Sequence, residues 1–274
     1  LKRNKLVYLE LIDCQVAGNG DYGVCLESIL DSCHSLQKLS LGRMSDIDIL
    51  LLNPSIFYRI CLQNGKSLKV LNLPNCKGMD VKSIKMIVDY CECLIKVDFA
   101  GTEMSEESID FLCENLSIDL EKLCFRGQNF YHEDNFERLI SRCTKLKTLE
   151  LNYTKSWKKQ AKYFTGYISE YLKDSLETIY MPPKDYISVT EFETIMFDLR
   201  TMSKLKVLRH NLHMSPVISL LKQALPHINI QNDESHMSII RLYHWIWDMK
   251  ADQVNMFETY KSFAGLSFYY GTCT

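Results

Sequence analysis

The chain has 274 residues, of which 46% are hydrophobic and 24% are charged, so it is long and apolar enough to bury a substantial core. The 32 Lys and Arg against 34 Asp and Glu leave a formal charge of -2, which argues against a nucleic-acid partner and against attraction to an anionic membrane. No apolar run approaches the ~18 residues that a membrane-spanning helix needs, and we expect a soluble chain.

One frame, Leu-x-x-apolar-x-apolar, recurs nine times along the chain. Its alternating end predicts a short β-strand in each copy. The copies follow one another at about 20 to 32 residues, close to the period of leucine-rich repeats. Each copy of the frame has three apolar positions, which we call slots, and His210 is the only polar residue at any of them. The frames begin at Leu6, Leu36, Leu68, Leu94, Leu120, Leu146, Leu176, Leu205 and Leu225.

Between the frames the apolar spacing becomes helical, as in Ile84, Ile87, Val88 and Cys91. Strand, helix and parallel strand in succession predict a right-handed α/β solenoid of the leucine-rich-repeat type, curved like a horseshoe. Its parallel strands would line the concave face and its helices the convex face. The second repeat is long and carries turn-forming residues at Asn53-Pro54 and Asn64-Gly65, so we expect a projecting loop there.

Residues 1–231 are predicted to form this solenoid of about nine repeats, and residues 232–274 a separate C-terminal cap or tail. The tail is rich in aromatic residues, among them Trp245 and Trp247, which are candidate partner contacts. Two alternatives stay open for it. It either caps the open end of the solenoid or crosses the concave face and forms part of a binding site.

The eleven cysteines are too dilute for a disulfide scaffold and odd in number, which favours reduced thiols in the cytoplasm or nucleus. Several recur at fixed offsets. Cys14 and Cys76 follow the last strand slot by three residues, and Cys33, Cys91 and Cys143 precede the leading Leu by three.

This cysteine pattern resembles the cysteine-containing repeats of F-box/leucine-rich-repeat proteins, over residues 1 to about 230. Residues 220–230 look like the last repeat of one member of that family, in which a C-terminal tail folds back over the concave face. The resemblance implies a substrate receptor of a cullin-RING ubiquitin ligase, whose F-box docks on the ligase adaptor while the repeats hold a protein substrate. The 274 residues contain no F-box, so we expect one, if present, to precede Leu1.

Side chains that alternate with the buried slots are expected on the concave face, where a protein partner would bind. Arg126 has the geometry to grip a carboxylate or phosphate, and Tyr180 and Arg209 are residue types enriched at binding hot spots. An alternative reading is an internal ladder of ion pairs that only keeps the face soluble. The candidate contacts are Asp98, Arg126, Glu150, Asn152, Tyr180, Arg209 and Asn211.

No catalytic constellation, metal-ligand spacing or phosphate-binding loop stands out, so we expect a non-catalytic chain without a cofactor. The leading hypothesis is the substrate-binding region of an F-box ubiquitin-ligase receptor. The alternative is a leucine-rich-repeat scaffold or inhibitor without an F-box and without any link to ubiquitin.

Overall fold

The computed structural model describes residues 6–12, 22–42, 50–51, 54–77, 79–102, 104–127, 133–151, 161–181, 189–210 and 215–232. All of them belong to one compact unit, Leu1–Asn232. The aromatic tail predicted for residues 232–274, with Trp245 and Trp247, lies outside the described residues apart from Asn232 and stays a prediction.

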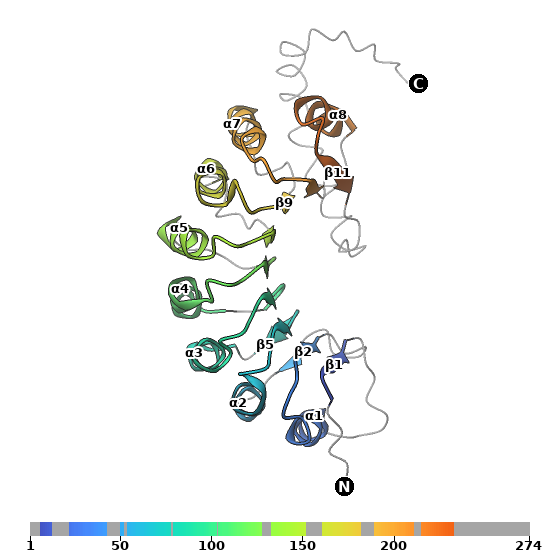
Figure 1. Ribbon diagram of the computed structural model, residues 1–274, viewed down its shortest axis with the longest axis vertical. Helices are drawn as coiled ribbons and strands as arrows, with labels where there is room; N and C mark the ends of the chain where they lie inside the picture. Colours follow the sequence, from blue (N-terminus) through green and yellow to red (C-terminus); the bar gives the residue numbers. More distant parts are fainter. Residues whose placement is uncertain are drawn as a thin grey trace, which may run out of the picture. The chain divides into compact units, whose positions relative to one another are not determined.

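Nine strands form one parallel sheet in which every strand pairs with the next one along the chain (Figure 1). This order confirms the predicted α/β class and the predicted parallel strands. The strands are β1 (Tyr8–Leu11), β2 (Lys38–Leu41), β4 (Val70–Asn72), β6 (Lys96–Asp98), β7 (Lys122–Phe125), β8 (Thr148–Leu151), β9 (Thr178–Met181), β10 (Val207–His210) and β11 (Asn229–Asn232).

A helix connects each strand of this sheet to the next, and in Figure 1 the helices lie on one side of the row of strands. From α1 to α7, neighbouring helices pack against one another. Ser105 caps α4 by accepting a hydrogen bond from the backbone N–H of Ser108 at 3.2 Å. The helices are α1 (Tyr22–Asp31), α2 (Pro54–Asn64), α3 (Val81–Tyr90), α4 (Glu106–Asn115), α5 (Glu133–Arg142), α6 (Ala161–Leu172), α7 (Val189–Arg200) and α8 (Ser215–Ala224).

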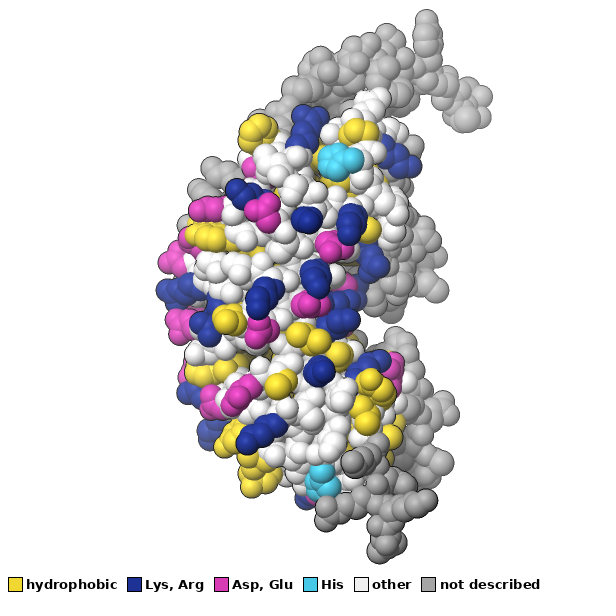
Figure 2. Space-filling view, viewed as in Figure 1, with side chains coloured by type: hydrophobic (Ala, Val, Ile, Leu, Met, Phe, Trp, Pro, Cys, Tyr) yellow, Lys and Arg dark blue, Asp and Glu magenta, His cyan; other side chains and the backbone are white. Residues whose placement is uncertain are grey.

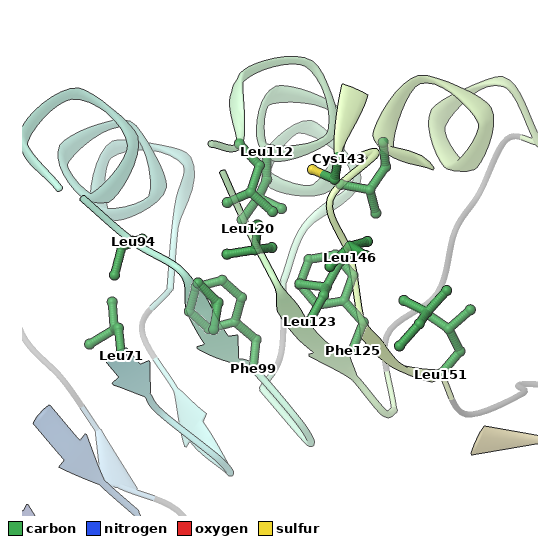
Figure 3. Packing of buried hydrophobic residues seen from close by; sticks show 14 of the residues in the cluster. Leu71, Leu94, Phe99, Leu112, Leu120, Leu123, Phe125, Cys143, Leu146 and Leu151 are labelled. Carbon is green, nitrogen blue, oxygen red and sulfur yellow. The ribbon is translucent and has the colours of Figure 1, made fainter. Parts of the chain in front are cut away.

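The core lies between the sheet and the helices, and the frame leucines fill it (Figure 3). The middle slot of the central strands, Leu71, Val97, Leu123 and Leu149, is at most 1% exposed. Each buried aliphatic side chain contributes about 1.5 to 3 kcal/mol before conformational entropy is subtracted. Aromatic rings continue the packing from repeat to repeat, with centroids 5.9 Å apart for Phe99 and Phe125.

The last repeat differs from its predicted frame. Ile230, not Ile228, pairs with Leu208, so the frame that begins at Leu225 is displaced. The N–H of Ile228 donates to the carbonyl of Leu225 at 3.1 Å, as the leading Leu146 does to Cys143. Ile228 therefore lies two residues before the residue that pairs with Leu208, whereas the leading Leu of the other frames lies three residues before its middle position.

Of the two pairs on which the projecting loop was predicted, Asn53 lies outside the described residues and Pro54 begins α2, whereas Asn64-Gly65 forms the end of α2 and a short turn. Asn64 ends α2 and accepts a hydrogen bond from the backbone N–H of Leu36 at 3.0 Å. A Cβ on Gly65 would overlap the carbonyl oxygens of Cys61 and Tyr90, so glycine permits a close approach of two repeats there. A two-residue strand β3 (Leu50–Leu51), paired with β5 (Cys76–Lys77), was not predicted.

Candidate functional site

The side of the sheet that points away from the helices carries the candidate site, and we call it the strand face. Successive residues of a strand point to opposite sides. Leu123 lies in the core, so Lys122 and Cys124 beside it lie on the strand face. The pairing register places Cys124, Glu150, Tyr180 and Arg209 in one row across β7, β8, β9 and β10.

Glu150 is the centre of this row. Its side chain is only 5% exposed, yet three basic side chains from two segments, β7 with the residue after it and β10, approach its carboxylate. Lys122 Nζ lies 2.8 Å from Oε1, Arg126 Nε lies 3.5 Å from Oε2, and Arg209 Nη1 lies 4.0 Å from Oε1. The thiol of Cys124 lies 3.7 Å from Oε2. We call Lys122, Arg126, Glu150 and Arg209 the Glu150 cluster.

The cluster keeps Glu150 ionised. Burial alone raises the pKa of Glu150, but the hydrogen bond and charge of Lys122, with the charges of Arg126 and Arg209, outweigh it and lower this pKa below its usual value. Burial, with the nearby charges of Asp98 and Glu150, raises the pKa of the Cys124 thiol to about 12. At neutral pH the cluster is therefore one carboxylate among three cations, beside a neutral thiol.

Tyr180 is a buried residue beside Arg126 and not an exposed contact residue. Its residue is 6% exposed, and the guanidinium carbon of Arg126 lies 5.9 Å from its ring centroid. That distance is at the limit for a cation–π contact. Tyr180 thus restricts the positions open to Arg126, which is itself only 18% exposed.

Asp98 lies one strand away from the centre, paired in register with Cys124. Its Oδ1 accepts a hydrogen bond from the backbone N–H of Ala100 at 2.9 Å, so one oxygen is occupied in holding the turn after β6. The other two predicted contacts, Asn152 and Asn211, lie outside the described residues.

The structure therefore brings together Arg126, Glu150, Tyr180 and Arg209 from the predicted set. It adds Lys122, which the sequence argument passed over. The available signal was its spacing, because Lys122 lies two residues before Cys124 and so shares its face. The alternative of an internal ladder of ion pairs is also present in part, since the Glu150 carboxylate pairs with Lys122 and Arg126 of the same chain.

On the face that Figure 2 shows, opposite charges are interspersed rather than gathered by sign. Just before the strands, Lys147 pairs with Glu121 and Lys206 with Glu177, each at 2.8 Å. Among the described residues, no three His, Cys, Asp or Glu side chains are grouped so as to hold a metal ion. No helix in the same part of the chain has the length and apolarity to span a membrane.

Eight cysteines whose side chains the structure describes have free thiols. Cys93 is exposed, and the others are buried. They are Cys33, Cys61, Cys76, Cys91, Cys113, Cys124 and Cys143.

No protein-family model matches the sequence, and no curated protein is detectably similar to it.

Proposed function

We propose that the parallel α/β repeat is a right-handed leucine-rich-repeat horseshoe whose strand face is concave and whose repeats are of the cysteine-containing type. The buried cysteines support this assignment. Cys91 and Cys143 each lie three residues before a leading Leu, and their carbonyls accept the N–H of Leu94 and Leu146 at 3.4 and 3.1 Å. A small, weakly polar side chain suits this buried turn in the two repeats that carry Cys91 and Cys143.

We further propose that the chain is a non-catalytic protein-recognition module, the substrate-binding region of an F-box receptor in a cullin-RING ubiquitin ligase. The Glu150 cluster is the observation that carries the recognition role. It gathers three basic side chains and the ring of Tyr180 on, or directly after, paired strands of one sheet. A partner that binds there therefore needs little ordering of these side chains. Ubiquitin transfer would be done by partner enzymes.

The link to ubiquitin rests on the resemblance of the repeats and of residues 220–230 to F-box/leucine-rich-repeat proteins, among them the S-phase kinase-associated F-box protein. The proposed partners are a protein substrate on the strand face and, through an F-box that would precede Leu1, the cullin-ligase adaptor. The reduced thiols suit a cytoplasmic or nuclear location.

Purification of the full-length protein from cells tests the ligase role. The proposal expects the cullin adaptor to co-purify in amounts comparable to the protein itself, and to be lost when the region before Leu1 is deleted. Recovery of other protein partners without the adaptor would overturn the ligase role and favour the scaffold or inhibitor without an F-box.

A further inference from the structure

The Glu150 cluster carries more positive than negative charge. Lys122, Arg126 and Arg209 bear three positive charges against the single carboxylate of Glu150, while the chain as a whole has a formal charge of -2. The Cys124 thiol, with a pKa raised to about 12, stays neutral, and Asp98 on the neighbouring strand, whose charge also acts on Arg126, offsets only part of this excess. The strand face therefore has a local positive field on a weakly acidic molecule.

The excess charge is accessible and converges on one place. Lys122 and Arg209 are 38% and 41% exposed, whereas Glu150 beneath them is 5% exposed. Both cations approach the same carboxylate oxygen, so their nitrogens lie no further apart than the sum of 2.8 and 4.0 Å. One incoming carboxylate can contact both of them.

Arg209 is the cation best placed for an incoming group. At 4.0 Å its Nη1 is too far from Glu150 to donate a hydrogen bond to it. A guanidinium offers a planar fork of donors that matches a carboxylate. The buried Glu150 holds the cations together against their mutual repulsion, so little reorganisation is needed when an anion arrives.

We propose that the Glu150 cluster binds an acidic segment of the protein partner, with Asp or Glu carboxylates of that segment contacting Lys122 and Arg209. This inference rests on the proposed recognition role of the strand face. Carboxylates on one segment offset the positive charge that Glu150 and Asp98 leave uncompensated. A dianionic phosphate would instead concentrate its charge close to the ionised Glu150, which repels it.

Binding of a labelled peptide to the intact 274-residue chain tests this inference without any adaptor or natural substrate. The probe is a short fluorescein-labelled peptide of alternating Glu and Gly, compared by fluorescence anisotropy with its Gln-Gly counterpart and with a phosphoserine-Gly counterpart. We expect the Glu peptide to bind at least about tenfold more tightly than the Gln peptide, with weaker binding at higher salt.

The deciding variant is Lys122→Gln/Arg209→Gln, in which both new side chains still donate hydrogen bonds and Glu150 keeps Arg126. It should weaken Glu-peptide binding at least about tenfold. The matched control, Lys147→Gln/Lys206→Gln, removes the same charge from exposed ion pairs outside the cluster and should bind as the wild type does. Unfolding temperatures of both variants verify that they are folded.

Equal loss in both variants, or no preference for Glu over Gln, overturns the inference. A stronger response to the phosphoserine peptide also overturns it, in favour of a phosphate site. Because no adaptor is present, these outcomes are separate from failure of the ligase role, which shows only in the co-purification.

Discussion

Glu150 combines two properties that rarely occur together, a buried side chain and a full negative charge. Burial of a carboxylate is unfavourable unless cations and hydrogen bonds compensate for the lost water. Lys122 does so directly, at 2.8 Å, while Arg126 and Arg209 stand further off. The consequence is a cluster whose geometry depends on one acidic side chain.

Replacement of Glu150 by Gln should lower the free energy of unfolding by about 2 kcal/mol at neutral pH, because three cations lose their counter-charge. The lowered pKa of Glu150 means that its contribution is present above the unfolded-state pKa of about 4.3 and is lost as pH falls through the folded-state value. The difference in free energy of unfolding between wild type and Glu150→Gln should therefore become smaller at acid pH. Urea unfolding at several pH values would measure it.

The control is Glu177→Gln, which removes an exposed ion pair with Lys206 and should change stability little at neutral pH. If the difference in free energy of unfolding between wild type and Glu150→Gln stayed constant from neutral to acid pH, the assigned ionised state of Glu150 would be contradicted.

Thiol reactivity separates the cysteines by position. Cys93 is exposed, whereas burial raises the pKa of Cys143 and of Cys76 to about 12. The thiolate is the reactive form, so iodoacetamide at pH 8 should label Cys93 at least tenfold faster, roughly, than these two buried thiols. Peptide mass spectrometry measures the rates. Fast labelling of Cys143 in the folded protein would contradict its place in the core.

For single residues, the sequence allowed us to predict on which side of the sheet a side chain lies, but not how much of it is exposed. Strand alternation correctly placed Arg126, Glu150, Tyr180 and Arg209 together. It did not show that Tyr180 would be buried, because exposure depends on the packing around the strand and not on alternation along it. Lys122 was missed because a lysine beside a buried position is usually solvated. The sequence does not show that its ammonium group reaches Glu150.

At the scale of the element, α3 shows how a helix is fixed in its repeat. Asp80 caps it by accepting hydrogen bonds from the backbone N–H and the hydroxyl of Ser83, at 2.8 and 2.7 Å. The hydrogen bond from the Ser83 backbone is the main cause that lowers the pKa of Asp80, so the cap is strongest when the carboxylate is ionised.

Replacement of Asp80 by Ala should cost about 1 kcal/mol of unfolding free energy at neutral pH. The matched control is Asp89→Ala, an exposed position in the same helix, which should have a smaller effect. Because the pKa of Asp80 is lowered in the folded state, the difference between Asp80→Ala and wild type should shrink as pH falls toward that value. Equal losses in the two variants would mean that the cap contributes nothing.

Elements with a regular frame were predictable, and irregular junctions were not. Eight of the nine strands follow their frames, and from β2 to β10 the middle apolar residue of each frame is buried. The ninth, β11, is displaced from its frame, since Ile230 rather than Ile228 pairs with Leu208. Gly65 likewise reads as a turn residue in isolation, and only the nearby carbonyl of Tyr90 shows why glycine is needed.

For the whole described unit, each repeat contacts its immediate neighbours, so stability should be transmitted locally. Leu123→Ala in β7 removes a fully buried side chain and should cost about 2 to 5 kcal/mol. Hydrogen exchange followed by mass spectrometry should show the largest loss of protection in β6, β7 and β8. A uniform loss from β1 to β11 would show a single cooperative unit instead.

The central claim is that the strand face around Glu150 recognises a protein partner, and comparative affinity capture from cell lysate tests it most directly. Wild type, Lys122→Gln/Arg209→Gln and the charge-matched Lys147→Gln/Lys206→Gln would each serve as bait, with captured proteins quantified by mass spectrometry. We predict a set of proteins retained by wild type and by the control but reduced at least about tenfold by Lys122→Gln/Arg209→Gln. Retention of the same set at the same level by all three baits would contradict the claim.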